Sequence, residues 1–388
     1  MLLFNATCIA LLLYIALLVA LCFPPAQDAA VYLHWVNFPF HVNWSAPERF
    51  GFGHNKVRNL YLKTPDNITL GAWHILPTHY YHMLNLRDMP TEQLTDSVYD
   101  EALSNQDYDT ILYFHGNAGN RAAPWRVQTY MRMADRWDVN VITVDYRGFG
   151  NSEGKPSEDG LHMDAMTVWN WAVKEKGASP ERTVILGHSL GTGIATRLAY
   201  ELGQKGITPR GLVLLAPYSS IPNVVFEYTF LSFISIFYPI KPFPYIQDFL
   251  LSRLNTKFDS LSYIEHINCT TLIAYGAKDT DIPIHHSARL FHRAIHGAEH
   301  YSEYATDWMR NDINVGVYTI PSEGTWFHYQ HEGGRRVDMV ELTHGHHNNV
   351  PLFDLAFEVM GQVTAVDGIA GELEMDDEAE PIEPFVVE

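Results

Sequence analysis

The stretch TVILGHSLGTGIAT (residues 183–196) joins an apolar run to a helix-forming run through the pentapeptide GHSLG. A strand, a sharp turn and a helix, with Ser189 at the turn, are the context that a nucleophile elbow requires. Gly187 and Gly191 carry no side chains where the turn brings backbone close to backbone, so Ser189 can be held strained with its hydroxyl exposed. The pentapeptide alone is also compatible with a glycine-rich connection that has no chemistry, so the other motifs must decide.

The composition restricts the classes of protein to which the chain can belong. With 388 residues, 47% of them hydrophobic, the chain can bury a large α/β core. The formal net charge of −19 argues against a nucleic-acid partner. The 20 histidines form no HExxH pattern and the three cysteines form no CxxC pair, so we expect no metal and no organic cofactor.

The first segment is almost wholly apolar from residue 2 to residue 23, and no lysine or arginine precedes Arg49. At 1.5 Å per residue, a helix of this length spans a bilayer core of roughly 30 Å. We therefore interpret residues 1–23 as a signal anchor, that is, a single transmembrane helix. A cleaved signal peptide is the alternative, but its apolar region is usually shorter and follows a positively charged start.

Residues 24–56 are rich in Pro, Trp, Phe and His, and we expect an irregular aromatic linker that lies at the membrane interface or packs on the following domain. Glycosylation triplets at Asn43, Asn67 and Asn268 favour a lumenal domain, so we expect a single-pass protein of the endoplasmic reticulum or another secretory-pathway membrane. The lack of flanking basic clusters leaves the orientation unspecified by charge.

Strand-like and helix-like runs alternate from residue 57 to residue 362, which we take as one α/β domain. Two runs, 57–62 and 69–76, predict a hairpin, whereas 77–107 is polar and aperiodic and predicts a surface excursion. The remaining apolar runs predict strands, and these alternate with predicted helices at 125–137, 160–176 and 194–202. The strand runs are 110–114, 139–144, 183–186, 212–216, 271–275 and 337–342. This alternation predicts a mostly parallel sheet flanked by helices, and the acidic end, 363–388, predicts a solvated, disordered tail.

Motif-like stretches follow these strands, at the sheet edge where α/β proteins bind ligands. They are HGNAGN (115–120), DYRGFG (145–150), GHSLG (187–191), APYSS (216–220) and GAKDTD (276–281). A serine nucleophile needs a base, and the base needs a carboxylate that orients it. Asp279 is the preferred acid because it is nearer the strand end than Asp281. The run THGHHNN after residue 342 offers three candidates for the base, namely His344, His346 and His347.

The glycine-rich HGNAGN turn predicts the second half of the site. Backbone N–H groups of Asn117 and of Leu190, the residue after the serine, would form an oxyanion hole. We interpret His115 as a structural hydrogen-bonding residue.

The strings FHGNAGN, DYRGFGNSEG, GHSLGTG and the D-x-x-x-P of DTDIP resemble the α/β-hydrolase superfamily. Within it, the chain resembles the membrane-anchored, Bem46-related α/β-hydrolase-domain lipases that act on monoacylglycerols and lysophosphatidylserine, over residues 57–360. The resemblance implies Ser189 as nucleophile, Asp279, four residues before Pro283, as acid, and His347 as base. The stretch 289–336, between the acid and the histidine, is longer than the helix and strand usual in this family and contains an unmatched segment, EYATDWMRNDINV and then TWFHYQHEGG.

A cap is expected at about 218–267, where the aromatic run could line an acyl-chain pocket and dip into lipid, or simply cover the domain. The expected function is membrane-bound hydrolysis of single-chain lipid esters through an acyl-enzyme. An acyl-protein thioesterase, a serine peptidase and a non-catalytic binding protein of the same fold are the alternatives. The sequence makes no prediction about acyl-chain length, head group or oligomeric state.

Overall fold

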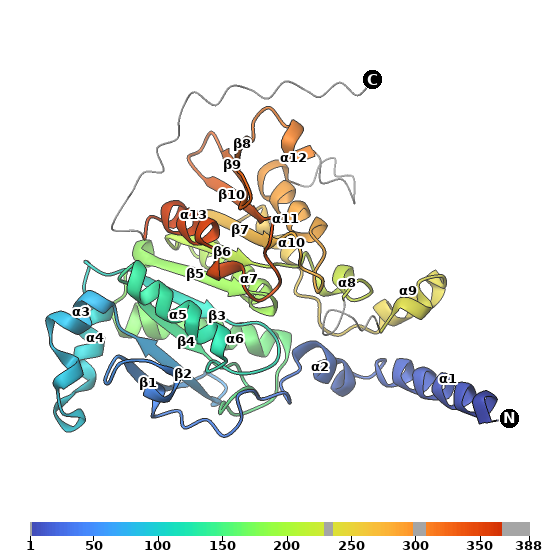
Figure 1. The fold of residues 1–388 in the computed structure, drawn as a ribbon, viewed down its shortest axis with the longest axis horizontal. Coiled ribbons are helices and arrows are strands. Elements are labelled where there is room, and N and C mark those ends of the chain that lie inside the picture. The colour runs from blue at the N-terminus through green and yellow to red at the C-terminus, as the bar shows by residue number, and fades with distance from the viewer. Residues whose placement is uncertain (1, 229–235, 298–307, 367–388) are drawn as a thin grey trace.

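The computed structural model describes residues 2–228, 236–297 and 308–366, with side chains from Thr7 onward within these ranges. They form a ten-stranded mixed sheet covered by helices, with the order β1-β2-β4-β3-β5-β6-β7-β10-β9-β8 (Figure 1). The strands are β1 (Val57–Lys63), β2 (Thr69–Ile75), β3 (Thr110–Phe114), β4 (Asn140–Val144), β5 (Thr183–His188), β6 (Gly211–Leu215), β7 (Thr270–Gly276), β8 (Gly316–Ile320), β9 (Gly324–Gln330) and β10 (Arg336–Leu342). The helices packed on the sheet are α5 (Pro124–Arg136), α6 (Glu158–Trp169), α7 (Leu190–Gln204), α10 (Ser260–Ile264), α11 (His285–His296) and α13 (Asp354–Thr364).

The centre of the sheet, from β4 through β3, β5, β6 and β7 to β10, is parallel throughout. Strands β3 and β5 are buried along their whole length, as expected for apolar strands covered on both faces. Every strand predicted from the apolar runs forms, and the predicted hairpin is the antiparallel β1–β2 pair. At the other edge, the antiparallel strands β9 and β8 extend the sheet beyond β10. The sequence analysis missed these two strands because they lie in the unmatched stretch 289–336.

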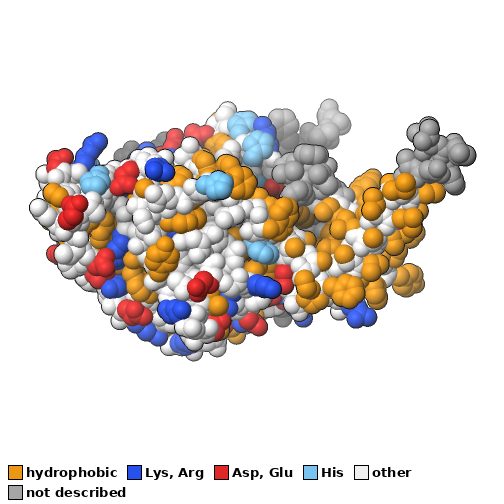
Figure 2. Space-filling view, turned by 90° about the horizontal axis from the view of Figure 1, so that it is seen from below, with side chains coloured by type: hydrophobic (Ala, Val, Ile, Leu, Met, Phe, Trp, Pro, Cys, Tyr) orange, Lys and Arg blue, Asp and Glu red, His pale blue; other side chains and the backbone are white. Residues whose placement is uncertain are grey.

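The N-terminal segment forms two helices, α1 (Leu2–Ala20) and α2 (Pro24–Tyr32). Among the described residues, no single helix is long and apolar enough to cross a bilayer. Thr7–Ala20 and Pro24–Tyr32 reach that length and composition only as a pair, bent by 98° at the break between them. Seen from below, orange apolar side chains gather at this end of the molecule (Figure 2).

The connection from β6 to β7, residues 216–269, is named here the β6–β7 insertion. It carries the short helix α8 (Ile221–Val224) and the helix α9 (Pro244–Ser252) before α10 returns to the sheet. Part of the expected cap, residues 229–235, lies outside the described residues, as does most of the expected acidic tail. Helix α9 lies beside the N-terminal helices at one end of the molecule (Figure 1).

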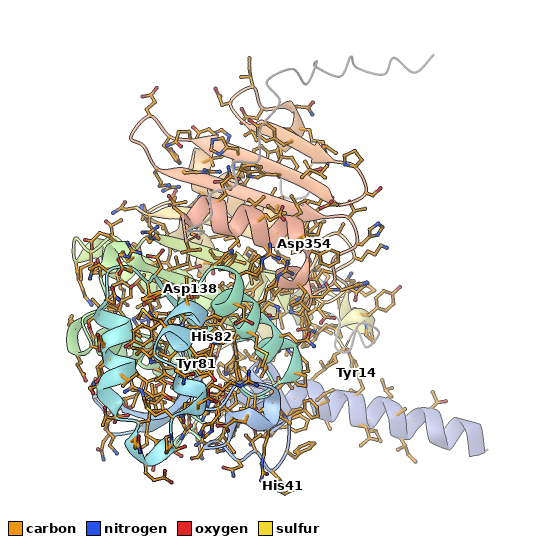
Figure 3. The ribbon with its side chains drawn as sticks, turned by 60° about the vertical axis from the view of Figure 1, so that its left-hand side comes forward. Tyr14, His41, Tyr81, His82, Asp138 and Asp354 are labelled. Atoms are coloured by element: carbon orange, nitrogen blue, oxygen red, sulfur yellow. The ribbon has the colours of Figure 1, made fainter. Side chains whose placement is uncertain are left out.

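Two regions contain helices that the sequence analysis did not predict: the surface excursion at 77–107, and the linker at 24–56, where the expectation of no regular element was wrong. Residues 77–107 contain α3 (Thr78–Met83) and α4 (Asp96–Ser104), with Tyr81 and His82 on α3 (Figure 3). Their tyrosines close a small separate core, so the region is a helical excursion. In the predicted linker, α2 is a regular helix and Pro47–Phe50 is a turn of 3-10 helix. Periodicity gave no signal in either region because these helices are only six to nine residues long and bury two or three side chains each, among them tyrosines and Gln27, which form no apolar stripe.

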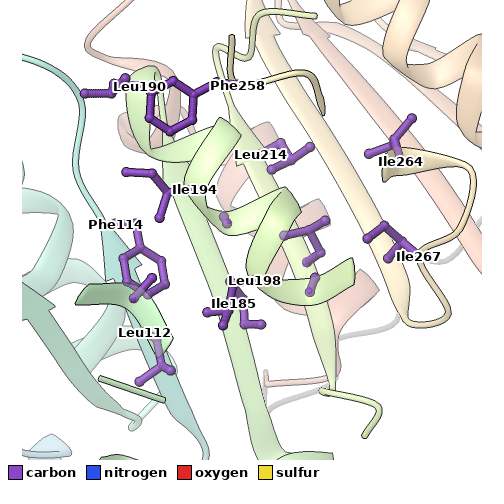
Figure 4. Close-up of a cluster of buried hydrophobic side chains, with 14 of the residues drawn as sticks. Leu112, Phe114, Ile185, Leu190, Ile194, Leu198, Leu214, Phe258, Ile264 and Ile267 are labelled. Atoms are coloured by element: carbon purple, nitrogen blue, oxygen red, sulfur yellow. The ribbon is translucent and has the colours of Figure 1, made fainter. Parts of the chain in front are cut away.

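The two faces of the sheet carry separate hydrophobic cores. Helices α5 and α13 cover one face, and α6, α7, α10 and α11 cover the other. In the second core, Ile194 and Leu198 of α7 pack on Ile185 of β5, with Leu112 and Phe114 of β3 beside them (Figure 4). The strand and the helix on either side of Ser189 are therefore fixed by buried apolar contacts.

Candidate active site

Ser189 lies at the turn between β5 and α7 in a backbone conformation that serine rarely adopts. Its φ is 51° and its ψ is −119°, which is a strained combination for a residue with a Cβ. The turn is held because the Ser189 N–H donates to the carbonyl of Leu215 at 2.9 Å. A Cβ on Gly187 would overlap the backbone of Gly191, and a Cβ on Gly191 would overlap the backbone of Phe114. The elbow predicted from GHSLG is confirmed, including the reason for both glycines.

Asp279 lies in the loop after β7, and its carboxylate is oriented by its own loop. Oδ1 accepts hydrogen bonds from the backbone N–H groups of Asp281 at 2.9 Å and Ile282 at 3.0 Å. This loop meets the loop after β10 where Gly276 contacts Gly345 so closely that a Cβ on Gly276 would overlap the Gly345 backbone. The preferred acid and the histidine loop are thus held together by a backbone contact.

His347 joins the other two side chains. Its Nδ1 donates to Oδ2 of Asp279 at 2.7 Å, and its Nε2 accepts from the hydroxyl of Ser189 at 2.8 Å. Burial disfavours the charged imidazole, but the hydrogen bond and charge of Asp279 outweigh burial and raise the pKa of His347 above its ordinary 6.5. Burial also opposes ionisation of Asp279, yet the hydrogen bond with His347 holds the pKa of that carboxyl below its usual value.

The other candidates do not face the serine. His344 and His346 are exposed and hydrogen-bond to the Nζ and the backbone carbonyl of Lys278, respectively. Asp281 contributes its backbone N–H to Asp279. Of the candidates left open by the sequence, the structure brings together Ser189, Asp279 and His347.

The HGNAGN turn lies directly against the serine, since a Cβ on Gly116 would lie 3.1 Å from the Cβ of Ser189. The N–H of Asn117 has no acceptor among the described residues, while the N–H groups of Ala118 and Gly119 donate to the carbonyls of Tyr32 and Val36. Leu190 is the first residue of α7, where backbone N–H groups have no intrahelical acceptor. The predicted oxyanion-hole donors, Asn117 and Leu190, are therefore both next to Ser189 in the fold.

One residue that braces this turn, Arg126, was missed by the sequence analysis. The guanidinium of buried Arg126 donates to the carbonyls of Gly116, Asn117 and Ala118 at 2.9–3.2 Å. Since these carbonyls point to Arg126, the adjacent N–H groups can point away from it. No local signal in the helix 125–137 distinguishes this arginine from a surface one.

His188, the residue before the serine, was also missed. It is buried, and its Nε2 donates to the backbone carbonyl of His347 at 2.9 Å. Burial, together with the charge of His347, lowers the pKa of His188 to about 3, so this ring is neutral. Its position inside GHSLG was the available signal. His115, by contrast, has the structural role that was expected, because its Nδ1 donates to the Gly116 carbonyl at 2.7 Å and its Nε2 lies 3.4 Å from Asp145.

A cavity of about 550 Å³ opens on Ser189. Asn117 and Leu190 lie beside Ser189 at one end of the cavity. Gln27, Tyr218 and Tyr228 also line it, and the remaining side chains are apolar. The apolar side chains come from α1 and the turn after it (Leu17, Leu21), from α2 and the residues after it (Ala26, Ala30, Val31, Leu33) and from the β6–β7 insertion (Val224, Phe237, Leu250, Leu251, Leu254). The segment predicted as a linker therefore forms one wall of the site.

One further polar cluster lies at the base of the insertion. Donor atoms of Glu227, His285 and His286 lie within 4.8 Å of one another and could hold a metal ion. His286 is buried, and its Nδ1 contacts the hydroxyl of Ser219 at 2.8 Å. Within the described residues, this cluster is separate from the hydrogen bonds that join Ser189, His347 and Asp279.

Comparisons with known proteins define the class. A family model described as alpha/beta hydrolase fold matches residues 109–232. An alpha-beta hydrolase from Vibrio vulnificus has a TM-score of 0.55 and 16% identity, with 88% of this chain and 92% of that chain covered. The esterase Pf2001 from Pyrococcus furiosus has a TM-score of 0.51 and 17% identity, with coverages of 84% and 94%. The protein has the α/β-hydrolase fold.

Sequence relatives narrow the class to a family. The chain is 34% identical to lysophosphatidylserine lipase ABHD12 of Xenopus tropicalis, with 73% of this chain and 69% of that protein covered. It is 33% identical to the enzyme of that name from Rattus norvegicus, with coverages of 72% and 67%. Protein ABHD12B of Homo sapiens is 31% identical, with coverages of 77% and 75%. The chain belongs to the ABHD12 family, and it is a hydrolase.

Proposed function

We propose that this protein hydrolyses the carboxylic ester of single-chain lipids, monoacylglycerols or lysophospholipids, through an acyl-enzyme on Ser189. The observation that carries the proposal is the hydrogen-bonded line from Ser189 through His347 to Asp279 at the end of an apolar cavity. Relatives named as lysophosphatidylserine lipases support the same substrate class.

In the acylation step, the Ser189 hydroxyl attacks the ester carbonyl while Nε2 of His347 takes its proton. The negative charge of Asp279 stabilises the imidazolium through Nδ1–H. The tetrahedral intermediate then collapses, the alcohol part of the lipid leaves with the proton from Nε2, and the acyl group stays on the serine oxygen. Water, deprotonated by the same Nε2, attacks the acyl-serine and releases the fatty acid.

The developing oxyanion is stabilised by the N–H groups of Asn117 and Leu190. One such donor is typically worth about 2.7–4 kcal/mol in the transition state. This role requires N–H groups that are not already used, which fits Asn117, whose N–H has no acceptor within the described ranges. Arg126, by binding the carbonyls of the turn, keeps the donor in position before the substrate arrives.

The cavity supports an acyl chain as the part of the substrate that is bound. Most of its lining is apolar away from Ser189. A bound hydrocarbon chain would displace water there, and each Å² of apolar surface removed from water stabilises the complex by about 25 cal/mol. The β6–β7 insertion then acts as the cap that covers this chain. A peptide would find few hydrogen-bond partners there, which favours substrates with a fatty-acyl chain over peptides. The preference for an oxygen ester over a thioester is supported by the relatives named as lysophosphatidylserine lipases.

The proposal includes attachment to a membrane of the secretory pathway, with the catalytic domain in the lumen. It is supported by the apolar helix α1 and by the exposed positions of Asn43, Asn67 and Asn268, which leave all three glycosylation triplets accessible. In microsomes, peptide N-glycosidase should reduce the mass of the wild type but not that of the triple Asn→Gln variant. An unchanged wild-type mass together with protease sensitivity of intact microsomes would place the domain on the other side.

The experiment that tests the function compares the wild type, Ser189→Ala and the control Ser97→Ala, an exposed serine on α4. We expect hydrolysis of lysophosphatidylserine and monoacylglycerol to fall by about 10⁴-fold or more in Ser189→Ala, as for other serine nucleophiles, and to be unchanged in the control. A fluorophosphonate should label the wild type and Ser97→Ala but not Ser189→Ala. Faster turnover of acyl-thioester or peptide substrates than of the lipid panel would contradict the proposed substrate class.

A further inference from the structure

Two elements far apart in the sequence form one exposed apolar region, named here the apolar lobe: helix α1 from Thr7 and residues 236–254 with helix α9. No charged residue precedes Asp28, and the second segment contains only Lys241, Asp248 and Arg253. None of the residues of α9 is buried, and Tyr245 is 88% exposed. Figure 2 shows the lobe as an almost uniformly apolar end of a molecule whose remaining surface is mixed.

Hydrogen bonds join the two parts of the lobe to each other and connect the second part to α2. The hydroxyl of Tyr14, which Figure 3 places on α1, donates to the carbonyl of Ile236 at 3.1 Å. The side-chain amide of buried Gln27 donates to the carbonyl of Arg253 at 2.8 Å and accepts from the N–H of Asn255 at 2.8 Å. Helix α9 therefore has a defined position against the N-terminal helices.

Helix α9 carries apolar side chains on two sides, with the exposed polar residues Asp248 and Ser252 beside them. Leu250 and Leu251 line the cavity that opens on Ser189. Tyr245, Ile246 and Phe249 point elsewhere and are 88%, 40% and 51% exposed. A helix that only covers a pocket in water carries polar residues on its outer side. The outer side of α9 thus needs an apolar environment that the described chain does not supply.

Charge and aromatic placement identify that environment as a lipid leaflet. The Nζ of Lys241 lies 5.9 Å from the ring centroid of Tyr238, and the guanidinium of Arg253 lies 5.4 Å from that of Phe249. Aromatic rings with adjacent cations at the end of an apolar surface are typical of membrane interfaces, where the rings lie at head-group level and the cations reach phosphates. The surface is also continuous with α1, which is apolar and largely exposed from Thr7 onward.

We propose that the outer side of α9 inserts into the leaflet beside α1, and that the substrate enters the cavity sideways from the bilayer between these two helices. This inference rests on the proposed function, because it assigns the entry route of the same lipid ester. The acyl chain would pass from the bilayer to the Leu250 side of the cavity without crossing water. The ester would then reach Ser189 from the apolar end.

The first test uses the double variant Tyr245→Asp/Phe249→Asp and the matched control Ile313→Asp, an apolar residue that is 96% exposed outside the lobe. Lysophosphatidylserine in phosphatidylcholine vesicles and the water-soluble ester p-nitrophenyl acetate are the substrates. We expect the double variant to lose on the order of tenfold on the vesicle substrate and to keep its rate on the soluble ester, because carboxylates are unfavourable near hydrocarbon. An unchanged vesicle rate would overturn the inference.

The second test does not depend on catalysis. An environment-sensitive nitrobenzoxadiazole label is placed on Tyr245→Cys or Ile313→Cys, each in a Cys8→Ser/Cys22→Ser background, and the protein is reconstituted in vesicles. We expect a blue-shifted emission, quenched by tail-brominated lipid, for position 245 only. Unquenched emission at 245, or emission that changes with protein density and indicates a second copy as the occupant, would overturn the inference. If the wild type hydrolyses neither ester, the proposed function fails, whereas the label still tests the docking.

Discussion

The cavity has two halves that are built in opposite ways. In the half that carries Ser189, Asp279 and His347, each side chain follows a buried strand of one parallel sheet and has defined hydrogen-bond partners. In the other half, the wall comes from α1, α2 and the β6–β7 insertion, and α9 contributes no buried residue. Reacting atoms need positions accurate to a fraction of an ångström, which a close-packed core provides, whereas a hydrocarbon chain needs only apolar surface.

The largest expected effect on activity comes from a substitution of Asp279, in the half of the cavity that carries Ser189. Asp279→Asn should lower kcat by about 10⁴-fold, because the amide cannot hold the tautomer of His347 that accepts the serine proton. Asp281→Asn, two residues further in the same loop, should change kcat only a few-fold, since its contribution to Asp279 is a backbone N–H. Steady-state hydrolysis of a soluble ester measures both. Similar losses in the two variants would show that the loop as a whole, and not one carboxylate, supports the reaction.

A change in the apolar half should affect only part of the substrate range. Ala26→Phe on α2 places a ring in the cavity and should lower kcat/KM for an 18-carbon lysophospholipid about tenfold, with a two-carbon ester unaffected. Hydrolysis of an acyl-chain series gives the result. A uniform loss over the whole series would mean that α2 supports the reacting groups as well as the chain.

His188 tests how rigid the chemical half is. His188→Phe keeps the ring but removes the donor to the His347 carbonyl, and an unpaired buried acceptor costs about 1–3 kcal/mol. We expect a lower melting temperature and a few-fold lower kcat. The exposed His346→Phe serves as the control, with a stability change within about 0.5 kcal/mol. If His188→Phe and the wild type had equal melting temperatures, the hydrogen bond from His188 would not help to hold His347 in place.

The smallest effect concerns pH. His347 must be neutral to accept the serine proton, so kcat/KM should fall as the pH drops through the pKa of His347. Because Asp279 raises this pKa, the midpoint should lie above pH 6.5 in the wild type. In Asp279→Asn the two contributions of Asp279 that raise the pKa of His347 are absent, while burial and the smaller opposing effect of the Asp281 charge remain, so the residual activity should persist to lower pH. A pH–rate profile of both proteins checks the sign, and an unshifted midpoint would contradict the assigned coupling.

Much of the chemical half could be predicted from the sequence, because its signals are local. An apolar run of strand length followed by GHSLG, GAKDTD or THGHHNN places a side chain at a known edge of a parallel sheet. The same reasoning located Asn117 and Leu190 beside the serine. The choice of His347 over His344 and His346 came from the family resemblance, since neighbouring residues of one loop differ only in direction, and direction depends on packing.

Contacts between segments that are distant in sequence could not be predicted from the sequence and are seen only in the tertiary structure. Helix α2 was read as an irregular linker, and its role as a wall of the cavity depends on Gln27 meeting the insertion more than two hundred residues later. The same holds for three other features that the sequence analysis missed, namely Arg126, His188 and the edge strands β8 and β9. Local patterns record how a segment pairs with its own backbone and with water, whereas the partner of a buried polar side chain is fixed only when the folded chain brings the two together.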